Sequence, residues 1–209
     1  KSWGYIDKQG NEVFPFIYSV ASDFHEDLAS VCLDHPNSHL NAKDHEWGYI
    51  NKNGELIIKL NGWGHDFTEG FARIGLFSNY KYIDKKGKIV IPCKYYQSGD
   101  FSEGLAYIVK KTGIFNKKEK YGFMDKQGNE VISCIYDSAY NFSEGLSRVS
   151  LNGKYGFINL DGIEVISCKF DWAMHFSEGL ALIENNKKYG FIDNYGVIKI
   201  PCLYDGTGD

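Results

Sequence analysis

The 209-residue sequence is poor in proline, with only 4 residues, and it contains no long hydrophobic run. The longest apolar stretches are a few residues long, such as Ile89 to Ile91, so no segment is long enough to span a bilayer. Hydrophobic residues make up 43% of the chain and aromatic residues 16%, which excludes a disordered tail. We therefore expect a folded chain without a transmembrane segment.

The sequence also lacks an excess of positive charge. Its net charge is −4, and lysine and acidic residues are mixed along the whole length. A general nucleic-acid-binding surface needs clustered lysine and arginine side chains to neutralise phosphates. We therefore expect no nucleic acid partner.

Motifs for catalysis and metal binding are missing as well. The chain has no Cys-x-x-Cys pair, Gly-rich phosphate loop, nucleophile elbow or Ser/His/Asp arrangement. The best metal candidate is a polar segment in which His35, His39 and His45 accompany Asp34 and Asp44, but this spacing matches no established site. We expect no metal, no other cofactor and no enzyme activity. An enzyme with a cleft built from these residues ranks third among the functions considered.

What the sequence does contain is an internal repeat. An aromatic-Gly-aromatic-aliphatic-Asp/Asn phrase starts near residues 3, 47, 121, 155 and 189, and a sixth copy near residue 80 carries Lys81 in place of glycine. The last three copies are 34 residues apart. A second phrase interleaves with the first, and its centres are Phe24, Phe67, Phe101, Phe142 and Phe176.

The second phrase places a glutamate two residues after each of these phenylalanines. Catalysis by carboxylates would need two carboxyl groups with different pKa values at one substrate, which five equivalent copies do not provide. A phrase that recurs in every repeat is typical of local structure. We interpret the serine or threonine and the glutamate as residues that accept backbone N–H groups in a tight turn, anchored in the core by the phenylalanine.

Each repeat predicts three short β-strands. In the last copy these strands are expected at residues 180–183, 189–193 and 197–204, and glycine or asparagine lies between them. Glycine after an aspartate or asparagine suits the positive φ angle of a hairpin loop. No long segment has apolar residues at helical spacing, so the predicted class is all-β.

These phrases resemble the WG repeat, also called the KWG repeat, which is found in bacterial proteins. The resemblance covers nearly all of the chain and implies a repeat scaffold without a defined activity. We expect one array over residues 1–209, built from three-stranded antiparallel repeats of about 34 residues in an open, elongated arrangement. A closed β-propeller is the alternative.

One repeated position holds four of the five cysteines. Cys93, Cys134, Cys168 and Cys202 occupy the same place in the third strand, where other copies have Phe16 and Leu60. A position that accepts cysteine, phenylalanine or leucine supplies apolar volume. We therefore interpret these cysteines as core residues and not as metal ligands.

Function is expected where the copies differ. In the first strand, Ser30, Arg73, Tyr107, Arg148 and Leu182 vary, and alternation places them opposite a repeated alanine, so we expect them to face outward. Two insertions lengthen the following turn at residues 33–46 and 110–120. They mark either a binding edge or tolerated surface insertions.

The candidate binding residues come from these variable positions. They are Trp63, Arg73, Tyr107, Arg148, Trp172, Lys117 and Lys118. Exposed aromatic and arginine side chains are typical anchors of protein interfaces, so the predicted function is a non-catalytic module that binds another protein. Glycan or cell-surface binding through the repeated aromatic rings is the alternative.

Overall fold

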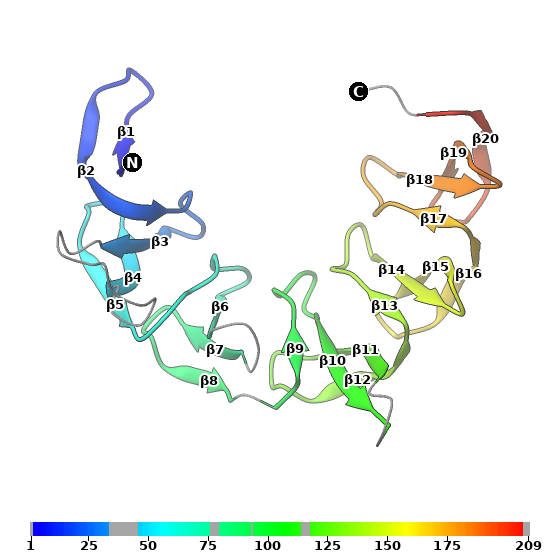
Figure 1. The fold of residues 1–209 in the computed structure, drawn as a ribbon, viewed down its shortest axis with the longest axis horizontal. Helices are drawn as coiled ribbons and strands as arrows, with labels where there is room; N and C mark the ends of the chain where they lie inside the picture. The colour runs from blue at the N-terminus through cyan, green and yellow to red at the C-terminus, as the bar shows by residue number, and fades with distance from the viewer. Residues whose placement is uncertain (1, 34–45, 76–79, 93, 114–117, 207–209) are drawn as a thin grey trace. The chain divides into compact units, whose positions relative to one another are not determined.

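The computed structural model describes residues 2–33, 46–75, 80–92, 94–113 and 118–206, and the regular elements in these ranges are all β-strands (Figure 1). The all-β prediction is confirmed. No helix suited to crossing a membrane occurs in the described part of the chain. The chain divides into two compact units, residues 1–94 and residues 95–209, which we call the N-terminal and C-terminal units. The expected single array over residues 1–209 stays a prediction.

The N-terminal unit contains two antiparallel sheets. Its five-stranded sheet has the order β1-β2-β3-β4-β5, and its three-stranded sheet has the order β6-β7-β8. The strands are β1 (Trp3–Ile6), β2 (Glu12–Ala21), β3 (Leu28–Leu33), β4 (Glu46–Asn51), β5 (Leu56–Leu60), β6 (Phe71–Ile74), β7 (Lys81–Asp84) and β8 (Ile89–Ile91). The long strand β2 pairs with β1 from Glu12 to Tyr18 and with β3 from Tyr18 to Ala21.

The C-terminal unit contains three four-stranded antiparallel sheets. The first has the order β12-β11-β10-β9, with β9 (Gln97–Ser98), β10 (Ala106–Thr112), β11 (Lys118–Met124) and β12 (Glu130–Tyr136). The second is formed by β13 (Ser138–Ala139), β14 (Leu146–Leu151), β15 (Lys154–Asn159) and β16 (Glu164–Phe170). The third is formed by β17 (Trp172–Ala173), β18 (Leu180–Asn185), β19 (Lys188–Asp193) and β20 (Ile198–Tyr204). Among the described strands, no sheet closes into a barrel.

In the C-terminal unit the three strands predicted for each repeat are present, and each sheet has one additional short strand. In the third sheet this strand is β17, where Trp172 pairs with Glu184 and Ala173 with Ile183. It precedes the Phe-Ser-Glu-Gly phrase, so the phrase forms the turn between β17 and β18. In this unit, a stretch of sequence from one aromatic-Gly phrase to the next therefore supplies two strands to one sheet and two strands to the following sheet.

The Glu-Gly pair forms a two-residue hairpin turn. Ser143 and Leu146 exchange both backbone hydrogen bonds, with N–O distances of 2.9 and 3.2 Å. Between them, Glu144 and Gly145 have φ angles of 55° and 79°, the pair of left-handed conformations that a type I′ turn requires. The turn that carries Asp27 in place of glycine keeps this geometry, since Asp27 has a φ angle of 72°.

The glycine of the aromatic-Gly phrase is needed for a different reason, which is the close approach of the next strand. A Cβ atom on Gly156 would lie 2.5 Å from the carbonyl oxygen of Ile166. The corresponding distances for Gly48, Gly122 and Gly190 are 2.4, 2.3 and 2.4 Å. The pairing of the second and third strands shifts at this point, which marks a bulge.

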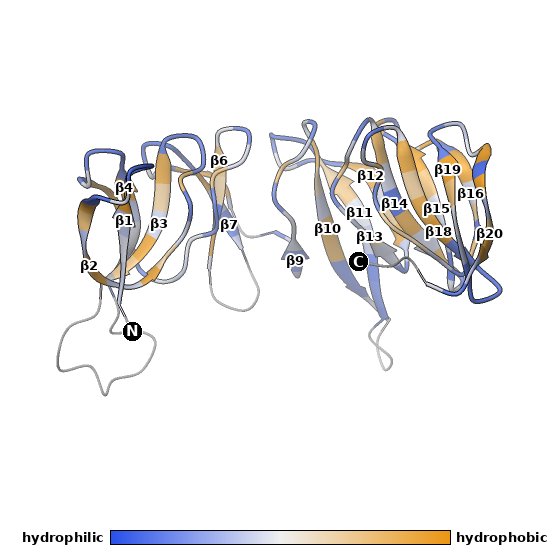
Figure 2. Cartoon of the chain, turned by 90° about the horizontal axis from the view of Figure 1, so that it is seen from above, coloured by the Kyte–Doolittle hydropathy of each residue, from blue (hydrophilic) through white to orange (hydrophobic). Residues whose placement is uncertain are grey.

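The core of the C-terminal unit lies between successive sheets. Phe157 and Ile166 on one face of the second sheet pack against Phe176, Ala181 and Ile183 of the third. An equivalent cluster joins the first sheet to the second. Figure 2 shows that hydrophobic residues lie along the strands of this unit, whereas its turns are hydrophilic. Both faces of a sheet with two neighbours are therefore covered.

This stacking corrects the expectation that the variable first-strand residues face outward. Ser30 and Leu182 are buried, and Arg73, Tyr107 and Arg148 are half-buried. They do lie opposite the repeated alanine, but that opposite face also contacts other parts of the chain. The expectation was wrong because it assumed a sheet with one covered face.

The cysteine position supplies apolar volume, as predicted. Cys134, Cys168 and Cys202 are half-buried, whereas Cys93 lies outside the described residues. Burial raises the pKa of the Cys134 thiol to about 12 and that of the Cys168 thiol to about 11, so both thiols stay protonated at neutral pH.

Candidate functional site

The predicted binding residues fall in both units. Trp63 and Arg73 belong to the N-terminal unit, and Tyr107, Arg148, Trp172 and Lys118 to the C-terminal unit. Lys118 is exposed at the start of β11. Lys117 and most of the residues 33–46 insertion lie outside the described residues, together with His35, His39 and His45.

The structure brings Tyr107 and Arg148 together in one groove, although they belong to different repeats. The groove has a volume of about 360 Å³. Its lining residues are Tyr107, Tyr140, Asn141, Phe142, Ser143, Arg148 and His175. We call it the Arg148 groove.

Arg148 is held by aromatic rings from two sheets. Its guanidinium carbon lies 3.6 Å from the ring centre of Tyr140, 5.6 Å from that of Tyr155 and 5.8 Å from that of Trp172. These contacts are cation–π interactions, which position the guanidinium without neutralising its charge. Its Nη1 donates a hydrogen bond to the carbonyl oxygen of Ala173.

The charge of Arg148 has no carboxylate partner within the described part of the chain. Its Nε atom is buried and makes no hydrogen bond to any described residue. A buried donor without a partner is costly, because it loses its hydrogen bonds to water. The groove therefore offers a positively charged, aromatic-lined surface to an anionic group.

Tyr107 is held in place by a glycine. A Cβ atom on Gly99 would lie 2.2 Å from the Cε1 atom of Tyr107, so the ring packs directly against this glycine. Gly99 and Tyr107 lie opposite each other, and the Gly99 N–H donates to the Tyr107 carbonyl oxygen over 2.9 Å. The orientation of the Tyr107 ring thus depends on the absence of a side chain at residue 99.

Sequence reasoning missed Tyr140 and His175 as groove residues. Tyr140 pairs with Arg148 across the strands, and its N–H donates to the Arg148 carbonyl oxygen over 3.2 Å. The position two residues before each central phenylalanine varies as strongly as the position of Arg148. Its residues are Ser22, His65, Gly99, Tyr140 and Met174. The variation at this position was the sequence signal that could have identified Tyr140 as a groove residue.

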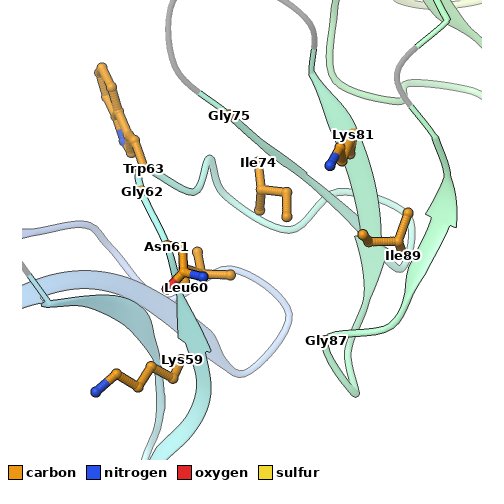
Figure 3. A pocket seen from close by; sticks show the side chains of 10 residues that line it. All are labelled: Lys59, Leu60, Asn61, Gly62, Trp63, Ile74, Gly75, Lys81, Gly87 and Ile89. Atoms are coloured by element: carbon orange, nitrogen blue, oxygen red, sulfur yellow. The ribbon is translucent and has the colours of Figure 1, made fainter. Parts of the chain in front are cut away.

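A second groove lies in the N-terminal unit and has a volume of about 440 Å³ (Figure 3). Lys59 to Trp63 contribute to it from the end of β5 and the chain that follows, and Ile74, Lys81 and Ile89 from β6, β7 and β8. Lys81 replaces the phrase glycine, which elsewhere allows the third strand to approach. Here β8 pairs with β7 only at Tyr82 and Ile83, and the groove opens beside this short pairing.

Trp63 and Arg73 belong to one aromatic cluster near this groove. Trp63 is 50% exposed and stacks with Trp47 and His65, at ring-centre distances of 6.1 and 5.4 Å. Arg73 places Nη2 3.3 Å from Nδ1 of His65 and lies 4.9 Å from the ring centre of Tyr80. Arg73 is therefore engaged by neighbouring rings and by a histidine.

Trp172 lines a third hollow at the last sheet, with a volume of about 600 Å³. Met174, Leu182 and Tyr189 contribute to the same hollow. Because Trp172 also lies near Arg148, it contacts two sheets. The three hollows differ in their lining residues, so the repeats are not equivalent as binding surfaces.

The repeated glutamates act as structural hydrogen-bond acceptors. The carboxylate of Glu103 accepts the N–H of Gly145, that of Glu144 accepts the N–H of Gly179, and both distances are 2.9 Å. Glu103 and Glu144 thus bind the turn of the next repeat, and not their own turns as expected from the sequence. Within the described residues, no three His, Cys, Asp or Glu side chains are grouped as metal ligands would be.

Comparison with known proteins addresses the identity of these repeats. The sequence profile described as "WG containing repeat" matches residues 3–34, 47–76, 82–113, 121–155 and 155–189. The chain belongs to the WG-containing repeat family. In the match over residues 121–155, the WG repeat covers β11 to β14 and so spans two sheets.

Other comparisons concern whole proteins. No curated protein matches the chain. A solved structure described as "Crystal structure of the eukaryotic initiation factor" has a similar fold, with a TM-score of 0.56 and 12% sequence identity. The similarity covers 93% of this chain and 59% of that one, so this chain spans little more than half the length of that chain. At this identity the similarity concerns the fold alone.

Proposed function

We propose that this WG-repeat chain is a non-catalytic binding module that recognises an acidic segment of a partner protein at the Arg148 groove. The observation that carries the proposal is the guanidinium of Arg148, which lines the groove without a carboxylate partner among the described residues. A partner's aspartate or glutamate supplies the missing anion and binds the guanidinium through charge-assisted hydrogen bonds.

The other residues of the groove support recognition of a polypeptide. Tyr107 and Tyr140 offer large, rigid rings that lose little conformational entropy on binding. Asn141, Ser143 and His175 add polar groups that can pair with a peptide backbone. Arginine flanked by tyrosine is the composition that dominates the energetics of protein interfaces.

The test is selection of peptides from a random displayed library on the full chain. We expect the enriched peptides to contain aspartate or glutamate and to lose about tenfold or more in affinity for Arg148→Met, as for removal of one partner of a charge pair. Arg73→Met is the matched control, because Arg73 occupies the same repeat position in the N-terminal unit. It should bind the enriched peptides like the parent chain.

Two outcomes would contradict the proposal. Enriched peptides without acidic residues, or with unchanged affinity for Arg148→Met, would remove the Arg148 groove as the site. Binding on a glycan array, without any enriched peptide, would favour the glycan alternative. Hydrogen exchange of the β14 amides in each variant verifies that the sheet remains folded.

A further inference from the structure

The groove in the N-terminal unit lies in the repeat whose phrase glycine is replaced by Lys81 (Figure 3). In the other five copies a Cβ atom at this position would lie 2.3 to 2.8 Å from a carbonyl oxygen of the third strand, which therefore crosses closely over the glycine. Lys81 has a side chain there, and its third strand β8 has three residues, whereas β12, β16 and β20 have seven. The same residue thus keeps the third strand away and lines the space that results. We call this hollow the Lys81 groove.

The side chain of Lys81 projects from the face of its sheet that packs on the first sheet. Lys81 lies opposite Ile74, and Ile83 lies opposite Ala72. Paired residues in antiparallel strands project from the same face. Ala72, Ile74 and Ile83 pack with Leu60 in the core of the N-terminal unit. Lys81 therefore extends this apolar face with a charged group at its border.

The charge of Lys81 has no neutralising partner, because no carboxylate of the described residues forms an ion pair with it. Lys59, the other lysine of the groove, differs in this respect, since its Nζ lies 2.5 Å from Oε1 of Glu46. The carboxamide of Asn61 also lines the groove and makes no hydrogen bond to a described residue. An uncompensated cation beside a free amide favours the binding of an anion.

The other side chains of the groove are apolar. Leu60 is buried at its base, Ile74 is half-buried, and Ile89 is 48% exposed. Trp63 adds an indole ring whose orientation is fixed by its stacking with neighbouring rings. Small-molecule sites combine largely apolar walls with a few polar groups, and their volumes are usually about 300 to 1,000 Å³. The Lys81 groove, with about 440 Å³, has this composition and size.

We propose that the Lys81 groove binds a small amphipathic carboxylate, that is, a molecule with an apolar body and a single carboxylate group. The body packs on Leu60, Ile74 and Ile89, and the carboxylate binds the Lys81 ammonium group. One ammonium group and one carboxamide suit a single carboxylate, whereas a phosphate dianion requires more donors. This inference is independent of the Arg148 groove, which belongs to the C-terminal unit.

The test is isothermal titration of the full chain with 2-naphthoate, and with decanoate as a flexible second probe. The neutral counterparts 2-naphthamide and decanol show how much of the affinity depends on the charge. We expect at least one acid to bind saturably and about tenfold or more tightly than its neutral counterpart, as for a charge-assisted hydrogen bond. Lys81→Met should reduce the affinity for the acid to that of the neutral counterpart, and Lys81→Arg should retain most of it.

Two control variants locate the effect. Lys8→Met makes the same change of charge at an exposed lysine outside the groove, so binding should stay within about twofold of the parent chain. Arg148→Met should also bind the acid like the parent, which separates this inference from the proposed function. Hydrogen exchange of the β7 amides verifies that the sheet remains folded in each variant.

Three results would overturn the proposal. The first is the absence of saturable binding for both acids. The second is equal affinity for an acid and its neutral counterpart, which would leave no role for the charge. The third is binding that Lys81→Met does not weaken, because the acid would then occupy another part of the chain.

Discussion

The carboxylate of Glu144 accepts a hydrogen bond from the backbone N–H of Gly179, 2.9 Å away, in the turn of the following repeat. Glu144 itself has a φ angle of 55°, in the left-handed region where glycine or asparagine is favoured. A glutamate is thus placed where its backbone is strained and its side chain reaches the next turn. We infer that the contact between turns offsets the strain.

This relationship predicts opposite effects for the same substitution at two turns. Glu144→Gly relieves the backbone strain but removes the hydrogen bond to Gly179, so we expect a lower free energy of unfolding. Glu178→Gly relieves the same strain, since Glu178 has a φ angle of 53°. It breaks no equivalent bond, because the Glu178 carboxylate accepts no backbone N–H from the turn of another repeat among the described residues. The two variants should differ by about 1 kcal/mol, with Glu144→Gly the less stable, in urea unfolding of the full chain. Equal stabilities would show that the contact contributes nothing.

The close approach at Gly156 predicts a large effect of a single methyl group. A Cβ atom there meets the Ile166 carbonyl oxygen at 2.5 Å and the Cys168 nitrogen at 2.6 Å, so Gly156→Ala must separate β15 from β16. We expect a loss of about 3 kcal/mol, as for severe overpacking. Gly153→Ala is the matched control, since nothing lies within 4 Å of its Cβ and only its φ angle of 75° is strained. Its cost should be about 1 kcal/mol.

The buried thiols predict a loss of stability at high pH. The folded-state pKa is about 12 for Cys134 and about 11 for Cys168, chiefly because of burial, whereas an ordinary thiol has a pKa of 9.0. The stabilisation is fully present below pH about 9 and is lost as the pH rises towards these folded values.

Urea midpoints measured between pH 8 and pH 11 test this expectation. The decline should be shallower in the double variant Cys134→Ala/Cys168→Ala than in the parent chain, because the variant has two fewer thiols to ionise. Tyrosines whose pKa values are raised without a contribution from either thiol, such as Tyr18 and Tyr121, contribute equally to both slopes. Identical slopes would exclude the two thiols as the source.

The contact between Gly99 and Tyr107 predicts an indirect effect on binding. In Gly99→Ala the new methyl group displaces the Tyr107 ring, which lies 2.2 Å from the Cβ position, and so reshapes the Arg148 groove. We expect a loss of about 1 to 3 kcal/mol in stability from overpacking, together with weaker binding of the acidic peptides. The double variant Gly99→Ala/Tyr107→Ala should regain stability but not affinity. Recovery of affinity in that variant would show that Tyr107 is not part of the site.

Much of the fold could be predicted because the same strand and turn phrases recur in several repeats. The recurrence of Tyr-Gly-Phe and Phe-Ser-Glu-Gly indicated strands and turns correctly, since these residues are fixed by local backbone geometry at Glu144 and Gly156. The short strand β17 was missed because two residues, Trp172 and Ala173, form no recognisable pattern. Their pairing with β18 follows from the turn geometry.

The groove was harder to predict because it depends on contacts between repeats. Tyr107 and Arg148 were both selected as variable residues, but their proximity depends on the stacking of successive sheets. The same stacking buried Ser30, which the alternation of a single strand could not reveal. Tyr140 and His175 were overlooked because each lies beside a conspicuous phrase whose residues drew the structural interpretation.

The offset between the WG repeat and the sheet bears on how such a chain changes during evolution. In the C-terminal unit one repeat of sequence completes one sheet and begins the next. An in-frame duplication of 34 residues there inserts a whole sheet and restores the contacts on either side of it. A deletion of the same length removes one sheet and likewise restores the contacts between the sheets that remain. Length can therefore vary by gene rearrangement at almost any breakpoint within the repeat, while side chains such as Arg148 diversify separately in each copy.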